Sequence, residues 1–213
     1  MVSSDTRASD HALLDAWRDG DKRAGNQLVS KYYSLIERFF LNKVPDSAAA
    51  DLIQRTFLKL LEGRDRIRET ASLRAYLLGI ARNLLYQFYD RRRRDGARVD
   101  FATQSAADLG PSPTTMIARE QEAQLLFQAL RRIPLESQMI LELYYWESMR
   151  AREIAALLEV PEGTARTRIR RAKQLLEREL ERVASSPELL QSTVSNLESW
   201  ALRLRRRVGA EPS

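Results

Sequence analysis

The chain contains no cysteine, and this absence excludes disulfide bonds, thiolate zinc sites and cysteine nucleophiles together. Histidine is almost as scarce, because His11 is its single example, so neither a catalytic histidine dyad nor a histidine metal cluster can be assembled. A phosphate-cradling Gly-rich loop is also missing. We therefore expect a protein that is not an enzyme and that holds no cofactor and no metal.

Long apolar runs are missing as well. No stretch approaches the roughly 20 residues that a membrane helix needs. The first 17 residues lack the basic and apolar regions of a signal peptide. The sequence thus predicts a soluble, cytoplasmic protein without a membrane partner, which agrees with the absence of cysteine.

Positive charge is abundant and unevenly placed. The 213 residues include 35 Lys or Arg and 29 Asp or Glu, which gives a net charge of +6. Arginines gather at Arg91–Arg94 and again between Arg166 and Lys173. Such clustering is typical of proteins that bind a polyanion, although a solvated helix surface is the commoner role of a charge run.

Apolar residues recur at helical spacing almost throughout, and no alternating strand pattern of useful length occurs. The pattern predicts an all-α fold. Helices are expected over these approximate ranges: residues 10–18, 22–42, 48–61, 73–94, 116–133, 135–146, 151–159 and 165–183. Residues 96–115 are rich in Ala, Ser, Asp, Gly and Thr without a helical face, which indicates a flexible linker between two small domains.

The second half of the chain contains a helix-turn-helix pattern. A short helix over 151–159 and a tight turn at Pro161–Thr164 precede a long helix that begins with basic residues. The planar fork of an arginine can bond a guanine edge or a phosphate bidentately. Acids appear only later in the long helix, so the charge is placed where DNA contact needs it. Ile154, Ala155, Leu158 and Ile169 are expected to form the small core between the two helices.

Glu159 stands where a helix-turn-helix tends toward positive φ, which predicts a strain of about 1 kcal/mol. Beyond the second domain, residues 184–213 show a further amphipathic pattern with alternating spacings of four and three. Its apolar positions are Leu190, Val194, Leu197, Ala201, Leu204 and Val208. Three roles stay open for this helix: packing on the second domain, binding a regulator, or touching DNA through Arg203 and Arg205–Arg207.

Four segments together resemble one protein family. They read LLDAWRDGDKRAGNQLVSKYY, DLIQRTFLKLL, SLRAYLLGIARNLLYQFYDRRRR and LRRIPLESQMILELYYWESMRAREIAALLEVPEGTARTRIRRAKQLLEREL. In this order they are similar to successive regions of the extracytoplasmic-function (ECF) subfamily of sigma-70 RNA polymerase sigma factors. The resemblance covers about residues 10 to 183. It implies core RNA polymerase and promoter DNA as partners, with an anti-sigma factor as a further candidate.

The resemblance also implies an organisation. Residues 10–95 would be sigma region 2, which binds core polymerase and opens the minus-10 element. Residues 96–117 would be the linker, and residues 118–183 would be region 4, which reads the minus-35 element as duplex. Residues 184–213 would form a C-terminal amphipathic extension that adds to the family core.

Site residues follow from the same resemblance. The positions implied to face the polymerase clamp are Asp51, Leu52, Gln54 and Phe57. Those implied at the minus-10 DNA are Tyr76, which replaces a usual Trp, and Arg82, Asn83, Arg91, Arg92, Arg93 and Arg94, beside the loop from Glu62 to Ser72. Those implied at the minus-35 DNA are Thr164, Arg166, Arg168, Arg170, Arg171 and Lys173.

One departure concerns the clamp-facing segment. The usual acidic cluster reads Ala48-Ala49-Ala50-Asp51 here, and Arg55 occupies a place that is often acidic. We therefore expect weakened polymerase binding and consider that a Ser/Thr kinase acting on Ser47 or Thr56 restores roughly two negative charges. The alternative is that Ser47 is a helix cap and Thr56 a buried helix residue.

Two competing functions must explain the same residues. A stand-alone helix-turn-helix repressor or activator would use the second domain but gives no role to DLIQRTF or to the basic helix at 73–94. An all-helical adaptor would use its arginines for solubility alone, and its binding would be insensitive to salt. A sigma factor needs both domains, and we therefore prefer this hypothesis.

Overall fold

The computed structural model describes residues 4–67, 72–92, 100–107, 121–196 and 199. These parts contain helices and no strand, apart from one isolated bridge between Ser105 and Pro134, so the all-α prediction is confirmed. The first group of helices is α1 (Ser4–Arg18), α2 (Lys22–Phe40), α3 (Asp46–Gly63), a 3-10 turn (Arg64–Arg66) and α4 (Leu73–Arg92). The second is α6 (Gln121–Arg132), α7 (Leu135–Tyr145), α8 (Ala151–Leu158), α9 (Glu162–Val183) and α10 (Pro187–Ser195).

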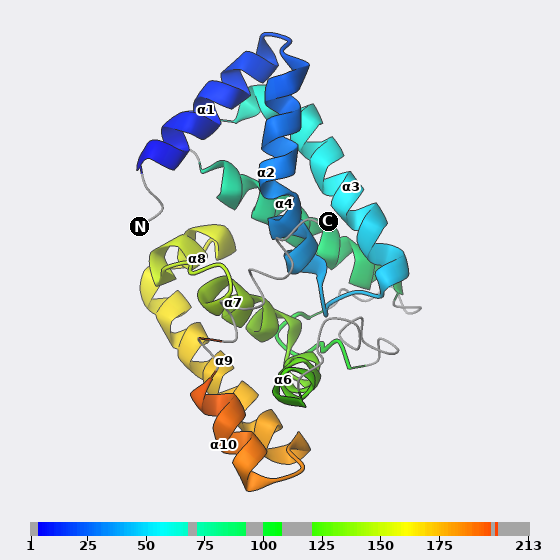
Figure 1. The fold of residues 1–213 in the computed structure, drawn as a ribbon, viewed down its shortest axis with the longest axis vertical. Coiled ribbons are helices and arrows are strands. Elements are labelled where there is room, and N and C mark those ends of the chain that lie inside the picture. Colours follow the sequence, from blue (N-terminus) through cyan, green and yellow to red (C-terminus); the bar gives the residue numbers. More distant parts are fainter. Residues whose placement is uncertain (1–3, 68–71, 93–99, 108–120, 197–198, 200–213) are drawn as a thin grey trace.

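Helix α2 is the centre of the first group and contacts α1, α3 and α4 (Figure 1). Its buried residues Leu28, Tyr32, Leu35 and Phe39 recur at spacings of four and three, which places them on one face. The side chain of Asp21 caps this helix by accepting a hydrogen bond of 2.8 Å from the N–H of Arg23.

The sequence predicts caps for two helices, Asp46 or Ser47 for α3 and Thr70 or Ser72 for α4. Ser72 does cap α4, because its hydroxyl accepts a hydrogen bond of 3.4 Å from the N–H of Ala75. The expectation that Asp46 or Ser47 caps α3 is wrong. Pro45 occupies the N-cap position, without a side-chain hydrogen bond, and both expected residues lie inside the first turn of the helix. The fixed φ of proline suits that position, so the helix begins two residues earlier than the pattern indicated.

Helix α9 is the centre of the second group and contacts α6, α7, α8 and α10. One face of it is fully or almost fully buried, and the residues on this face are Ala165, Ile169, Ala172, Leu176 and Leu180. Two alanines in the first half let α7 and α8 approach closely, while the leucines in the second half fill the space toward α6. The opposite face of the first half remains in solvent.

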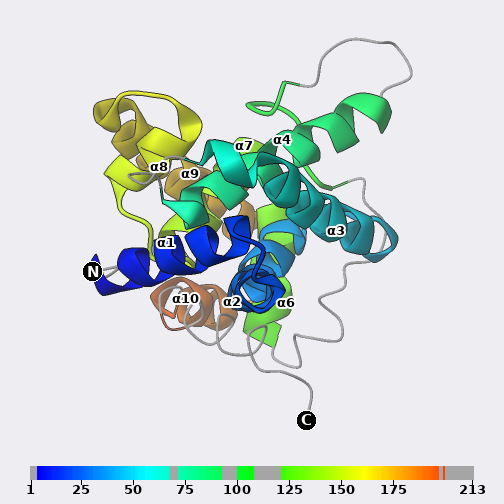
Figure 2. The same cartoon turned by 90° about the horizontal axis from the view of Figure 1, so that it is seen from above.

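The two groups lie directly against each other where α4 contacts α8. The first group lies above the second in Figure 1 and therefore overlies it in the view from above (Figure 2). The described part of the linker joins them instead of looping free. Phe101 is buried with its ring centroid 3.7 Å from that of Tyr86. Its carbonyl accepts a hydrogen bond of 3.1 Å from the N–H of Glu136, and that of Gln104 accepts one of 2.7 Å from Leu135. Residues 100–107 therefore form a fixed strap, because one aromatic side chain anchors them.

The described part of the C-terminal extension, α10, packs on α6 and α9. Thr193 is buried and donates to the carbonyl of Leu189 at 2.7 Å, while Ser192 bonds Glu122 on α6. Packing on the second domain is thus the role that the structure shows for residues 187–195. The other expected apolar positions from Leu197 onward, and the arginines beyond them, lie outside the described residues.

Within the part of the chain that the structure describes, no helix is both long and apolar enough to cross a membrane.

The close contact between α1 and α2 generates a stability prediction. A Cβ added at Gly25 would lie 2.6 Å from Cε2 of Trp17, far inside van der Waals distance. We expect Gly25→Ala to lower the free energy of unfolding by about 1–3 kcal/mol through overpacking. Gly163→Ala is the matched control, since nothing lies within 4 Å of its added Cβ. Urea unfolding followed by circular dichroism measures both, and equal midpoints for the two variants would contradict the prediction.

Candidate nucleic-acid interface

Helices α8 and α9 form the predicted helix-turn-helix. Glu159 ends α8 in the left-handed region, with φ 57° and ψ 43°, as expected from its position. The N–H of Val160 then bonds the carbonyl of Ala155 at 3.0 Å, which closes the turn. The expected small core is confirmed, because its four members are buried: Ile154, Ala155, Leu158 and Ile169.

The solvent-facing side of α9 carries part of the predicted DNA-binding set. Arg166, Arg170 and Arg171 are exposed, and Thr164 is half-buried in the first turn. Arg166 pairs with Glu162 at 2.7 Å on the surface, and such an exposed pair contributes little, so its guanidinium remains available to a phosphate. Sequence reasoning missed Thr167 and Gln174, which are exposed at the same end of the helix.

Two residues of the predicted set contact α7. Arg168 forms an ion pair with Glu136 on α7, and the ammonium of Lys173 lies 4.5 Å from the ring centroid of Tyr144 and 4.9 Å from that of Tyr145. Successive residues of a helix turn by about 100°, so a continuous basic run cannot all face one partner. Arg168 and Lys173 brace α9 against α7.

Helix α4 presents a second basic surface. Asn83 is exposed, and the guanidinium of Arg82 donates to the hydroxyl of Tyr86 at 3.1 Å. Arg91 and Arg92 are exposed in the last turn of the helix, while Arg93 and Arg94 lie outside the described residues. These side chains are placed where a negatively charged strand could contact them.

The aromatic residues of α4 divide between this surface and the core. Tyr76 is half-buried, with its hydroxyl beside Gly63. Tyr86 and Phe88 are half-buried as well. Tyr89 is core, since it is 5% exposed and its hydroxyl donates to the carbonyl of Lys43 at 2.6 Å.

The segment predicted to face the polymerase clamp lies on α3. Asp51 and Gln54 are exposed, and Phe57 is half-buried and stacks on Tyr33 with centroids 6.3 Å apart. Leu52 is 1% exposed, so its assignment to a binding surface is corrected: the helical period turns it into the core.

Sequence reasoning missed an apolar patch beside these residues. Leu58 and Leu61 on α3 are 47% and 42% exposed, and Tyr33 on α2 is 45% exposed. The signal was available, because α3 has apolar residues on two faces instead of one. Exposed apolar patches mark contacts with other proteins. Next to them, Asp51 pairs with Arg55 at 3.5 Å on the surface, so a positive charge lies beside the remaining acid of the segment.

The two candidate phosphorylation sites differ in access. Ser47 is exposed in the first turn of α3. Thr56 is completely buried and donates its hydroxyl hydrogen to the carbonyl of Leu52 at 2.8 Å. A kinase cannot reach Thr56 in this conformation, so that candidate is corrected, and it behaves as the buried helix residue named as the alternative.

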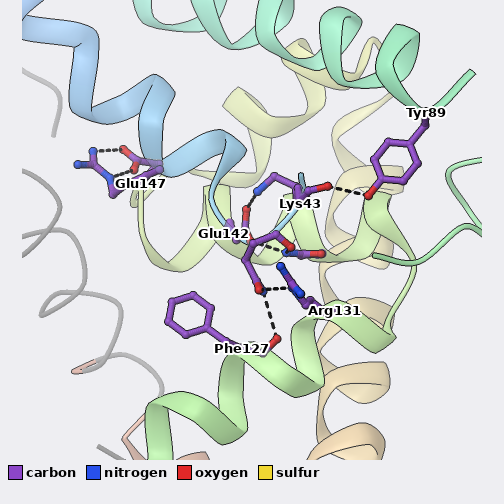
Figure 3. Close-up of polar contacts among 9 residues, drawn as sticks. Lys43, Tyr89, Phe127, Arg131, Glu142 and Glu147 are labelled. Carbon is purple, nitrogen blue, oxygen red and sulfur yellow. Dashed lines mark hydrogen bonds and ion pairs between the residues drawn. The ribbon is translucent and has the colours of Figure 1, made fainter. Parts of the chain in front are cut away.

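A buried polar cluster between the two groups of helices was not foreseen (Figure 3). Arg38 donates to Glu147 at 2.8 Å, Arg74 donates to the same carboxylate at 2.9 Å, and Lys43 pairs with Glu142. Burial lowers the pKa of the Lys43 ammonium well below its ordinary value, and the carboxylate of Glu147 opposes this shift. The signal for Arg38 was its position three residues after the buried Leu35 of α2, whereas Lys43 lies beyond the end of this helix.

Two family models match the chain: Sigma-70 region 2 at residues 28–95, and Sigma-70, region 4 at residues 123–176. Together these segments make up more than half of the 213 residues. The chain is also similar to the ECF RNA polymerase sigma-E factor of Escherichia coli (strain K12), with 26% identity over 181 residues that span 81% of this chain and 95% of that protein. The protein of the same name from Haemophilus influenzae is 24% identical over 182 residues, which span 81% and 96%.

Two solved structures share the fold of this chain. CnrH in complex with the cytosolic domain of CnrY matches with a TM-score of 0.62 and 22% identity, over 83% of this chain and 99% of that one. The sigma factor RpoE in complex with the anti-sigma factor NepR from Bartonella quintana matches with a TM-score of 0.56 and 21% identity, over 75% and 98%.

The chain belongs to the sigma-70 family and is a sigma factor of the ECF type. It is therefore a transcription initiation factor with a DNA-binding region 4, and not an enzyme.

The left-handed residue of the turn generates a prediction about the helix-turn-helix. Replacing Glu159 by Gly removes the steric cost of its Cβ, so we expect Glu159→Gly to raise the free energy of unfolding by about 1 kcal/mol. Ala156→Gly introduces glycine into the right-handed part of α8 and should lower the free energy of unfolding by about 1 kcal/mol. Urea unfolding measures both, and changes of the same sign would refute the assigned backbone.

Proposed function

We propose that this sigma factor binds core RNA polymerase and directs transcription to promoters that it selects through two surfaces. The observation that carries the proposal is the exposed arginine face of α9, held in a helix-turn-helix by a buried core. Promoter selection by region 4 and strand contact by region 2 are what the ECF resemblance implies. The geometry of the described residues supports both.

The minus-35 element would be read as duplex by α9. Its first two turns are free of neighbouring helices on the outer side, so the helix can enter a major groove. Arg170 and Gln174 are one turn apart on this side and match the chemistry of guanine and adenine edges, while Arg166 and Arg171 reach phosphates. Arg168 and Lys173, which contact α7, fix the angle at which the helix is presented.

The minus-10 element would be contacted by α4 and its surroundings. Melted strands expose base faces and phosphates, which suit aromatic rings and arginines respectively. Tyr76, Arg82 and Asn83 are the described residues that we assign to this surface, together with Arg91 and Arg92 at the end of the helix.

Core polymerase would dock on α3. We assign this contact to Asp51, Gln54 and Phe57 and extend it to the exposed Leu58 and Leu61. An apolar patch can compensate for the single, already paired acid, because burying exposed leucines stabilises a complex without any charge.

Regulation at the same surface would use Ser47. A phosphate there adds negative charge in the first turn of α3, where the helix dipole favours it, on the helix that carries the polymerase contact. An anti-sigma factor belongs to the proposal as a partner, since two structural neighbours were solved with such proteins or their domains. The extension packs on region 4 and would act by covering or releasing α6.

The polymerase assignment predicts the outcome of run-off transcription with purified core polymerase on a promoter library. The chain is expected to add specific transcripts to those of core polymerase alone, and Ser47→Asp is expected to increase their yield several-fold. Ser185→Asp, an exposed substitution remote from α3, is the control. Equal transcript yields from the unsubstituted chain and from Ser47→Asp would contradict regulation at Ser47 and leave the proposed sigma function standing. Binding of duplex without any transcript would favour the stand-alone helix-turn-helix regulator instead.

The assignment of α9 predicts a difference between two arginines of the same helix. Arg170→Ala removes a proposed base contact and should weaken binding of a selected duplex by about 1–3 kcal/mol, roughly 5- to 150-fold. Arg178→Ala removes the same charge two turns further on, where the residue is also exposed, and should change affinity little. Fluorescence anisotropy with a labelled duplex compares them. Equal losses would mean that α9 contributes charge and no base contact.

A further inference from the structure

The contact between the two groups of helices is built around buried charges. Five residues make it, and we call them the latch: Arg38, Lys43, Arg74, Glu142 and Glu147. The side chains of Arg38 and Glu147 are each 8% exposed, and that of Lys43 is 0% exposed. Arg38, Lys43 and Arg74 come from region 2, whereas both acids come from α7 and its end. Each ion pair therefore joins region 2 to region 4.

A second layer of polar contacts surrounds Asn42, which lies in the turn after α2 with φ 64°. Two of its partners, Phe127 and Arg131, are labelled in Figure 3. Its amide donates to the carbonyl of Phe127 at 3.1 Å, and its side-chain oxygen accepts from Arg131 at 2.7 Å. Gln138 donates to its backbone carbonyl at 3.3 Å. The side chain and the carbonyl of Asn42 are thus bonded by α6 and α7 of region 4.

The strap of residues 100–107 closes the same arrangement from the other side. Phe101 packs between the rings of Tyr86 and Tyr89 on α4, with centroids at 3.7 and 5.8 Å, while its carbonyl is bonded to α7. One residue of the linker therefore holds a helix of each domain. The Phe101 contacts therefore hold residues 100–107 in place between the two domains in this conformation.

Closure packs against each other the two elements that the proposed function assigns to DNA. The Cδ1 atom of Leu157 on α8 lies 3.9 Å from the position of a Cβ at Gly79 on α4. Arg74, in the first turn of α4, is bonded to the carboxylate and the backbone carbonyl of Glu147. The helix proposed to face the minus-10 strand is consequently packed against the helix-turn-helix proposed to face the minus-35 duplex.

The distance between the two promoter elements shows that the closed molecule is too small to contact both. Elements centred 25 base pairs apart are separated by roughly 85 Å along B-form DNA, at 3.4 Å per pair. A compact chain of 213 residues has a radius of gyration of about 17 Å. A closed molecule of that size cannot contact both elements, so the two regions must separate before the promoter is engaged.

The chemistry of the latch suits a reversible closure. Breaking one partner of a buried ion pair is costly, because it leaves an uncompensated charge in the interior. Separating both partners into water costs much less free energy, since each charge regains its hydration. A latch made of ion pairs is therefore specific in its geometry, yet its two halves are compatible with solvent once they part.

We propose that the latch and the Phe101 strap hold the chain in an autoinhibited, closed state without help from any partner protein, and that opening of this contact limits its activity. This inference rests on the proposed function, because inhibition is defined by the loss of promoter engagement. Closure itself is a property of the chain alone.

The test uses the full chain and exploits its lack of cysteine. Gln27→Cys and Glu181→Cys place two dyes on exposed positions of α2 and α9, and their energy transfer reports closure. Glu147→Gln leaves Arg38 and Arg74 without their carboxylate and is expected to lower the transfer and to raise transcript yield at least several-fold with core polymerase. Glu177→Gln, exposed on α9, is the matched control and should change neither quantity.

Phe101→Ala tests the strap without altering any charge and should act in the same direction as Glu147→Gln. Thr103→Ala, exposed in the same segment, is its control. A lock tests the opposite direction: Gly79→Cys and Leu157→Cys, bridged by a disulfide or a short bis-thiol reagent, fasten α4 to α8. Transcription should be lost in the disulfide-bridged form and return on reduction, so that each preparation is its own control for folding.

The outcomes separate the two proposals. If Glu147→Gln and Phe101→Ala leave energy transfer unchanged, there is no latch. If they lower the transfer but transcript yield stays the same, closure is not inhibitory. If the transfer changes as expected while no variant supports any transcription, the proposed sigma function fails and the closed state alone is established.

Discussion

The carboxylate of Glu147 has to be neutralised inside the protein, and the relation between the two regions depends on how this is done. Two guanidinium groups from different helices of region 2, Arg38 on α2 and Arg74 on α4, bind it. A buried carboxylate with one donor would still be costly, whereas two charge-assisted partners satisfy both oxygens. Because the three side chains come from three elements, their positions fix how α2, α4 and the end of α7 approach one another.

The helix-turn-helix depends on a different constraint, which is the space between α8 and α9. Small residues such as Ala155, Ala165 and Ala172 permit a close approach, and the left-handed Glu159 reverses the chain without an intervening loop. The buried apolar face of α9 then sets the rotation of this helix, and the ion pair between Arg168 and Glu136 on α7 is compatible with it. The side chains that point outward are selected by this rotation and not by the order of basic residues in the sequence.

Helical periodicity predicted most of the fold, since an amphipathic pattern determines which face of a helix is buried. It also predicted the core of the helix-turn-helix, whereas the positive φ of Glu159 was predicted from its position in the helix-turn-helix pattern. It could not place individual charges of the basic run, because a run has no period: Arg168 and Lys173 contact α7, whereas other members of the run are exposed. The sequence pattern also could not predict the contacts between the two regions. Arg38 could be seen on the apolar face of α2, but its partner lies 109 residues away.

The contacts of Arg168 and Lys173 with α7 bear on how ionic strength acts on this protein. Each cation that neutralises a DNA phosphate releases counterions, and the logarithm of affinity falls by about 0.9 per contact for each tenfold rise in salt. A basic run counted from the sequence overstates that number, because charges already occupied within the protein release nothing. The affinity of α9 for DNA should therefore fall with salt less steeply than the number of its basic residues implies. The protein then retains more of its DNA affinity when the ionic strength in the cell rises.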